Sequence, residues 1–99
     1  MSYAIAFNLR TEDLTQYYSE KSPGNAYKEI GNFLKAHGFI HQQGSLYFGN
    51  ETIDAVRCVL LVQKLSKKLL WLSKCVTDIR MLRIEENNNL MPALEVDKD

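Results

Sequence analysis

The chain begins with a run of alternating hydrophobic residues, "YAIAFNL", at positions 3–9. Such alternation is typical of a β-strand, in which successive side chains point to opposite faces. The bulky side chains share one face and the small ones the other: Tyr3, Ile5, Phe7 and Leu9 against Ala4, Ala6 and Asn8. The bulky face suits a core covered by helices, and the small face could be approached closely by another surface.

A helical pattern follows after a polar stretch, Thr11–Lys21, which is expected to be a loop with a short turn at Glu12–Tyr17. Ser22 fits the N-cap of the helix and Pro23 its first position. The apolar spacing then continues to the end of the helix at Gly38, through Ala26, Ile30, Phe33, Leu34 and His37. Gly31 costs about 1 kcal/mol relative to alanine inside a helix, which predicts tight packing there.

The middle of the chain predicts a hairpin, with a strand at Phe39–His41, a turn at Gln42–Gly44 and a return strand at Ser45–Phe48. In the return strand, Ser45 and Tyr47 share one face, and Leu46 and Phe48 share the other.

Asn50 or Thr52 is the expected cap of the next helix, which runs to about Leu65. Its helical spacing is carried by Val56, Val59, Leu60 and Gln63. A second short helical piece follows, with Leu70, Trp71 and Val76 expected to point inward. The last long strand is Thr77–Glu85, in which Arg80 and Arg83 lie on opposite faces.

The order of elements is strand, helix, strand, strand, helix, strand, which predicts an α+β ferredoxin-like βαββαβ fold. Helices would cover one face of a four-stranded antiparallel sheet. We expect the domain to span residues 1–86, followed by a polar, acidic tail at 87–99 that is loose or docks on a partner through Leu90, Met91, Leu94 and Val96. No helix remains for the other sheet face, so a second copy of the chain is the simplest cover.

Composition narrows the class of protein. The chain has 99 residues, of which 45% are hydrophobic and 24% charged, values ordinary for one globular domain. The sequence has no apolar run long enough to predict a membrane span. Its first apolar run does not have the pattern of a signal peptide. Cys58 and Cys75 lack metal-ligand spacing, and we expect both to be reduced core thiols in a cytoplasmic protein.

The zero net charge is unevenly spread. Between Arg57 and Arg83 there are seven basic residues and one acid, Asp78, so this segment carries +6 and the rest of the chain −6. A positive field of this kind could attract phosphates. On charge alone, a solvated helix face with charged strand ends is the favoured explanation.

Three stretches together closely resemble the VapD family, the virulence-associated protein D group. They are "YAIAFNL", "GFIHQQGSLY" at 38–47 and "WLSKCVTDIRMLRIE" at 71–85. The likeness extends through Glu86. It is weakest in Thr11–Lys21 and after Asn87.

The resemblance implies a ferredoxin-like homodimer similar to the small CRISPR-associated nucleases, with endoribonuclease activity. Some members of the family are toxins of bacterial toxin–antitoxin pairs, with a small protein antitoxin of the VapX type as partner. The resemblance also implies an aspartate after "AF" in the first strand, taken as catalytic, where this chain has Asn8.

An aspartate at that position would have two plausible uses. Carboxylates from two subunits could share a divalent cation such as Mg²⁺, or one could act as general base on the ribose 2′-hydroxyl. Asn8 is uncharged and serves neither purpose well, although its shape is nearly the same. The exchange is therefore either a deliberate inactivation or a natural loss or relocation of activity. A non-catalytic dimer that binds an antitoxin or a nucleic acid is the alternative function.

Other candidates have ordinary structural explanations beside the functional ones. Ser45 and Tyr47 could place two hydroxyls beside Asn8, or pack in a dimer seam. Arg80 and Arg83 suit phosphate binding, but pairing with Asp78 or Glu85 is the favoured role of each. At a helix end, positive charge is favourable in any case, so Lys64, Lys67 and Lys68 are ambiguous as RNA contacts.

Three further residues are not expected to act on substrate. His37 ends a helix and His41 begins a turn, and no second ligand cluster accompanies them. Trp71 is expected in the core rather than as a platform for base stacking.

Overall fold

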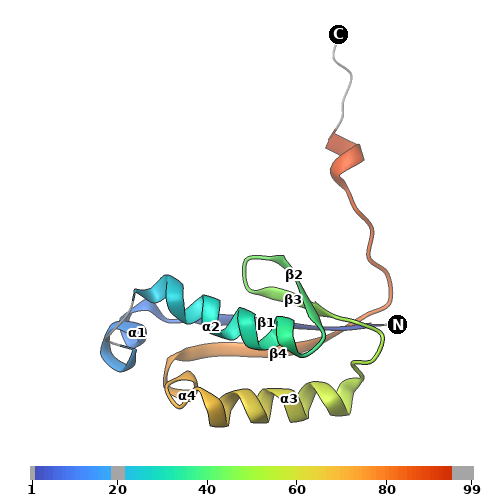
Figure 1. Ribbon diagram of the computed structural model, residues 1–99. Coiled ribbons are helices and arrows are strands. Elements are labelled where there is room, and N and C mark those ends of the chain that lie inside the picture. Colours follow the sequence, from blue (N-terminus) through green and yellow to red (C-terminus); the bar gives the residue numbers. More distant parts are fainter. Residues whose placement is uncertain (1, 19–21, 95–99) are drawn as a thin grey trace.

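The computed structural model describes residues 2–18 and 22–94 and has the expected mixture of helices and strands (Figure 1). In chain order the elements are β1 (Ser2–Leu9), α1 (Thr11–Tyr17), α2 (Pro23–Ala36), β2 (Phe39–Gln43), β3 (Leu46–Gly49), α3 (Ala55–Lys68), α4 (Leu72–Cys75), β4 (Val76–Ile84) and the 3₁₀ turn η1 (Met91–Leu94).

The four strands form one antiparallel sheet in the order β2-β3-β1-β4. β1 therefore lies inside the sheet between β3 and β4, while β4 occupies an edge. Pairing of the first strand with the last confirms the ferredoxin-like arrangement. It also brings residues about 70 positions apart in the sequence directly opposite each other.

One face of the sheet is covered by α2 and α3 (Figure 1). The main core joins that face to both helices through Ile5, Phe7, Ile30, Phe33, Leu34, Cys58, Leu61 and Leu65. The bulky face of β1 is thus the covered one, as its alternation predicts. Both cysteines are buried free thiols, also as expected.

The expectation of a loop at Thr11–Lys21 is wrong for residues 11–17, which form α1. Glu12 and Asp13 lie in its first turn, where negative charge is favourable. Leu14 is buried in a small second core with Tyr18, Ala26 and Cys75. A single buried leucine in a polar run gives no periodicity, which is why the pattern alone did not reveal this helix. Residues 19–21 lie outside the described part of the chain.

Gly31 is packed as tightly as its position predicts. A Cβ atom there would collide with the hydroxyl oxygen of Tyr47 and come within 3.2 Å of its Cζ. Gly38, with φ of 97°, takes the left-handed conformation expected at the end of α2. These two glycines allow the helix to lie close to β3 and then to turn into β2.

The hairpin differs slightly from its prediction. β2 extends to Gln43, so the turn consists of Gly44 and Ser45, and Ser45 precedes the return strand. The cap of α3 is Asp54 rather than Asn50 or Thr52: its Oδ1 accepts a hydrogen bond of 2.8 Å from the Arg57 backbone N–H.

The buried residues of α3 are Cys58, Leu61 and Leu65. Three of the residues that carry the helical spacing in the sequence, Val56, Val59 and Leu60, are exposed. Leu70 is also exposed rather than inward. Trp71 does pack on the core, with its ring 4.7 Å from that of Tyr18.

From residue 85 the chain leaves the sheet and extends away from the body as far as η1 (Figure 1). Leu90, Met91 and Leu94 are exposed along this arm, and Val96 lies outside the described residues. Among the described helices, none has the length and apolar character needed to cross a membrane.

Candidate active site on the open face of the sheet

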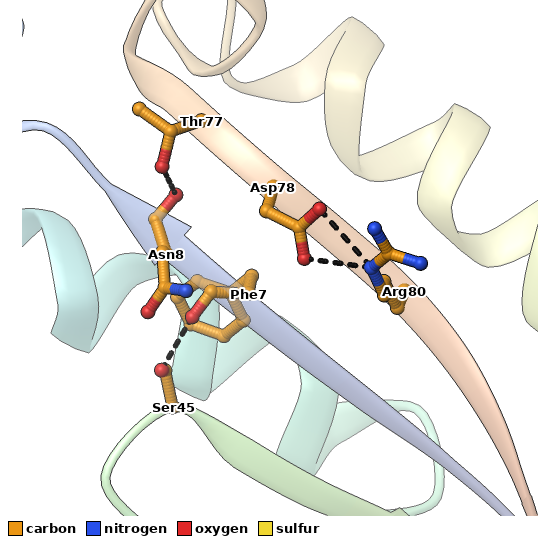
Figure 2. A network of polar contacts seen from close by, with 6 residues as sticks. All are labelled: Phe7, Asn8, Ser45, Thr77, Asp78 and Arg80. Carbon is orange, nitrogen blue, oxygen red and sulfur yellow. Dashed lines mark hydrogen bonds and ion pairs between the residues drawn. The ribbon is translucent and has the colours of Figure 1, made fainter.

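Asn8 lies near the end of β1, on the sheet face opposite to α2 and α3, and its side chain is exposed. In the register with β4, Asn8 is opposite Asp78 and Ala6 is opposite Arg80. Directly opposed residues of antiparallel strands point to the same face. The amide, the carboxylate and the guanidinium therefore gather on one surface (Figure 2).

Asp78 and Arg80 form a close ion pair on that surface. The Arg80 Nε donates to both carboxylate oxygens of Asp78, at 3.1 Å each. The two side chains are 44% and 70% exposed respectively, so solvent screens the pair and it adds little stability. Both groups remain accessible to a ligand that approaches the open face.

Ser45 fixes the hairpin turn against β1 beside Asn8. Its Oγ donates a hydrogen bond of 2.5 Å to the Phe7 carbonyl oxygen (Figure 2). The Phe7 N–H in turn donates to the Ser45 carbonyl oxygen at 3.2 Å. The hydroxyl proton is thus engaged, while the oxygen keeps lone-pair capacity to accept a bond. Ser45 consequently holds the turn in place at the edge of the candidate site.

The pairing of β1 with β4 shifts register between Asn8 and Leu9. Thr77 Oγ1 donates to the Asn8 carbonyl at 3.3 Å at this irregularity. Bulges of this kind bend a strand and redirect side chains, and they are frequent beside active sites. The strand ends just past Asn8, so the polar cluster lies at the margin of the sheet rather than at its centre.

These residues surround an open depression of about 510 Å³. Its walls come from β1, the hairpin and β4: Ala6, Phe7, Asn8, Gln43, Gly44, Ser45, Leu46, Asp78 and Leu82. Apolar contacts line one part of it, and the polar groups gather at the Asn8 end. An extended polar ligand could therefore lie across the sheet with one of its polar groups beside Asp78.

Tyr47 does not belong to this surface, contrary to the expectation that its hydroxyl lies beside Asn8. It pairs with Ile5 on the covered face, is 5% exposed and stacks on Phe7 with ring centroids 6.2 Å apart. Burial raises the pKa of its phenol. Because Ser45 lies in the turn, its hydroxyl can bond to β1 although Tyr47 points into the core.

The other basic candidates lie elsewhere. Arg83 is opposite Tyr3, on the face opposite that of Arg80, and its Nη2 is 3.9 Å from Glu85 Oε1. Lys67 and Lys68 are in the last turn of α3, in the layer on the covered side of the sheet. The Lys68 Nζ lies 5.8 Å from the centre of the Phe33 ring. Of the four predicted substrate-binding residues, only Arg80 lies beside Asn8.

Each of the two histidines contacts a backbone carbonyl oxygen. His37 Nδ1 is 2.8 Å from the Phe33 carbonyl oxygen, and His41 Nε2 is 2.7 Å from that of Gly44. His41 also stacks on Tyr47. Neither lines the depression.

Asp78 is the residue of this site that the sequence pattern did not single out as functional. The spacing of Asp78 and Arg80 indicates only an ion pair on one strand face. Asp78 becomes a candidate because the register between β1 and β4 places it opposite Asn8. That register pairs the first strand of the domain with the last. A check of which strand-four residue faces Asn8 in a ferredoxin-like sheet could have identified it.

The polar cluster offers few metal ligands within one chain. In residues 2–18 and 22–94 no three histidine, cysteine, aspartate or glutamate side chains gather in a way that could hold a metal ion. Asp78 and the Asn8 amide oxygen are nonetheless of the hard-oxygen type that Mg²⁺ accepts, and Mg²⁺ commonly takes only one or two protein ligands.

Comparison with known proteins gives a consistent set of relatives. The chain is 55% identical to Endoribonuclease VapD 2 of Riemerella anatipestifer over 93% of this chain and 98% of the relative. It is 49% identical to the Endoribonuclease VapD homolog of Helicobacter pylori, over 95% and 97%. Identity to Endoribonuclease VapD of Dichelobacter nodosus is 40%, over 85% and 87%. No family model matches the sequence. Identity of this extent over nearly full length shows that the chain belongs to the VapD family.

Proposed function

We propose that this protein is an endoribonuclease whose cleavage site is the depression around Asn8 and Asp78. The observation that carries the proposal is the direct opposition of these residues on an exposed sheet face, with Arg80 beside them. The names of its relatives supply the reaction class.

Cleavage of RNA requires activation of an oxygen nucleophile and stabilisation of negative charge on the phosphate. Asp78 is the carboxylate of this cluster, and it could accept a proton from the ribose 2′-hydroxyl. Arg80 presents further N–H donors to a phosphate beyond the Nε that contacts Asp78. Should a divalent cation bind, Asp78 and the Asn8 amide oxygen would hold it, and it would supply charge neutralisation at the phosphate.

The amide at position 8 weakens this machinery. Asn8 adds no second negative charge, and near neutral pH it does not act as a base. We therefore infer that the chain as written cleaves RNA slowly or not at all, and that Asn8→Asp restores a carboxylate pair at the site. Because Asn8 is exposed and the exchange is isosteric, the fold should tolerate it.

A second copy completes the proposed site. The open face also carries apolar side chains, among them Ile40, Leu46, Phe48 and Leu82, which none of the helices in the described residues covers. Two such faces packed about a two-fold axis would bury these groups and could bring both Asn8–Asp78 pairs to one seam. A cytoplasmic toxin role, with a small protein antitoxin of the VapX type as partner, extends the same proposal.

The test is cleavage of a fluorescent single-stranded RNA by four proteins: the chain as written, Asn8→Asp, Asp78→Asn and Asn8→Asp/Asp78→Asn. General acid–base groups typically contribute 10²- to 10⁴-fold. We expect Asn8→Asp to raise the rate by at least about a hundredfold over the chain as written, and the double variant to lose that gain. Asn32→Asp, the same exchange on the exposed side of α2, is the matched control and should change nothing. Equal rates for the chain as written and Asn8→Asp would show that position 8 is not catalytic.

Asn8 itself favours a second function, that of a non-catalytic dimer which binds a nucleic acid or an antitoxin. If neither the chain nor Asn8→Asp cuts RNA or slows growth on expression, while RNA still binds, this binding function is the better description. Binding that Asp78→Asn strengthens would fit it, because loss of a carboxylate removes repulsion of phosphate.

A further inference from the structure

The outer side of α3 carries large apolar side chains that the core does not use. Val56, Val59 and Leu60 are 69%, 49% and 56% exposed. They are spaced i, i+3, i+4, the spacing of one helix face. The core side of the same helix is a different set, Cys58, Leu61 and Leu65. α3 is therefore apolar on two sides, and a helix with that pattern normally packs between two surfaces.

Basic residues border this outer face. α3 contains Arg57, Lys64, Lys67 and Lys68 and no acidic residue. Arg57 and Lys64 are seven positions apart, so they stand on the same flank of the helix. Together with Val56, Leu60, Leu61 and Asp54 they line a hollow of about 370 Å³. The Asp54 carboxylate at its end already caps the helix through the Arg57 backbone N–H.

The pattern is that of one half of a helix–helix interface. Val56, Leu60 and Gln63 follow the i, i+4, i+7 row that meets a partner helix, and Val59 adds to it. Arg57 and Lys64 occupy a flanking position, where charged residues select the partner. An occupant of complementary chemistry would present an apolar row and an acidic flank.

Other occupants fit less well. Two copies of α3 face to face would oppose four positive charges with four, which is unfavourable. Within the described residues, the chain offers no acidic helix long enough to match: α2 carries Lys28, Lys35 and one acid, Glu29, and α1 has only seven residues. RNA would use the basic flank but gains nothing from the exposed valines and leucine. A membrane surface usually selects aromatic residues, which this face lacks.

We propose that the outer face of α3 (Val56, Arg57, Val59, Leu60, Lys64) is a docking site for an acidic amphipathic helix of a second protein. The site lies on the helix layer, beneath the sheet in Figure 1, whereas the Asn8–Asp78 depression lies on the open face. A partner there would leave the open face free for a second copy or for RNA.

The probe is a synthetic helical peptide with leucines at i, i+3, i+4 and i+7 and glutamates on the flanks, followed by fluorescence anisotropy. Its matched control has lysines in place of the glutamates. We expect saturable binding of the acidic peptide alone. Leu60→Gln and Lys64→Glu should each weaken it by at least about tenfold, as loss of an interface anchor does. Leu70→Gln, at a leucine 77% exposed just beyond α3, should leave it unchanged.

Because Val56 and Leu60 are exposed, their glutamine variants should melt within about 4 °C of the parent, as surface substitutions normally do. A large loss of stability would mean that this face is packed within the protein itself. The proposal is overturned if the acidic peptide does not bind, or if both peptides bind equally. It is also overturned if anionic vesicles or single-stranded RNA compete with the peptide, or if the protein self-associates in a way that Leu60→Gln abolishes. RNA cleavage by the Asn8→Asp protein is measured separately and does not depend on this face.

Discussion

The hydroxyl of Tyr47 occupies the space that a side chain at Gly31 would need. Alanine at this position would gain up to about 1 kcal/mol of helix propensity, but overpacking of a well-filled core typically costs 1–3 kcal/mol. We expect Gly31→Ala to lower the free energy of unfolding by about 1 kcal/mol, and by no more than about 2 kcal/mol, measured by urea titration.

The control for this contact is a double-mutant cycle with Tyr47→Phe, which removes the colliding oxygen. The phenylalanine variant should tolerate Gly31→Ala better than the parent does, although the ring carbon at 3.2 Å remains close. Additive effects of the two changes would contradict the contact.

Much of the fold could be predicted from the sequence, because the alternation and the helical spacing of hydrophobic residues indicate strands and helices directly. β1 is the clearest case, since Ile5 and Phe7 are buried on the face that its pattern marks as bulky. The buried side of α3 could not be predicted, because the helix is apolar on both sides. The row through Val56 and Leu60 is as regular as the row through Cys58 and Leu65, and periodicity alone cannot choose between them.

Only part of the candidate site could be predicted from the sequence, for a related reason. Asn8 stood out as the amide in an apolar strand. Its neighbour Asp78 depends on the register between the first and last strands, and a slip of one residue would turn that carboxylate to the other face. Tyr47 shows the same limitation, because its face follows from pairing with Ile5.

Ser45 should matter for both stability and the candidate site. Ser45→Ala removes the hydrogen bond from Oγ to the Phe7 carbonyl, and the loss of one such bond costs about 1 kcal/mol. In the Asn8→Asp background we also expect slower RNA cleavage, because the turn beside position 8 loses its tie to β1. Ser73→Ala, at an exposed serine of α4, is the control and should affect neither quantity. Unchanged stability in Ser45→Ala would argue against this hydrogen bond.

Tyr18 predicts a loss of stability at alkaline pH. Burial raises the pKa of its phenol to about 12, and a hydrogen bond donated to Glu29 acts in the same direction. An unfolded tyrosine ionises near pH 10, so the neutral phenol contributes its full stability below about pH 10. That contribution is lost progressively as the pH rises toward 12, and a two-unit shift corresponds to at most about 3 kcal/mol.

Urea titrations between pH 9 and 12 measure this effect. Burial also raises the pKa of Cys58 and Cys75, so part of the decline comes from the thiols. We expect Tyr18→Phe to make the decline shallower. We expect Glu29→Gln to make it smaller and to end it at a lower pH, because the folded-state pKa of Tyr18 falls when the neighbouring charge is gone. A decline of the same shape in Tyr18→Phe would assign it entirely to other groups.

Arg80 is expected to contact RNA phosphate, whereas Arg83 on the opposite strand face is not. Each phosphate contact adds roughly one unit to the slope of log affinity against log salt concentration. We therefore expect Arg80→Gln to weaken binding of a short single-stranded RNA and to reduce that slope by about one. Arg83→Gln should leave the slope nearly unchanged. The measurement is fluorescence anisotropy over a salt series. Asp78→Asn serves as a third variant: removal of its carboxylate should strengthen RNA binding but leave the slope unchanged, because Arg80 still contacts the phosphate. A slope that falls with Arg83→Gln instead would place the RNA on the helix-covered side of β4 and away from Asn8.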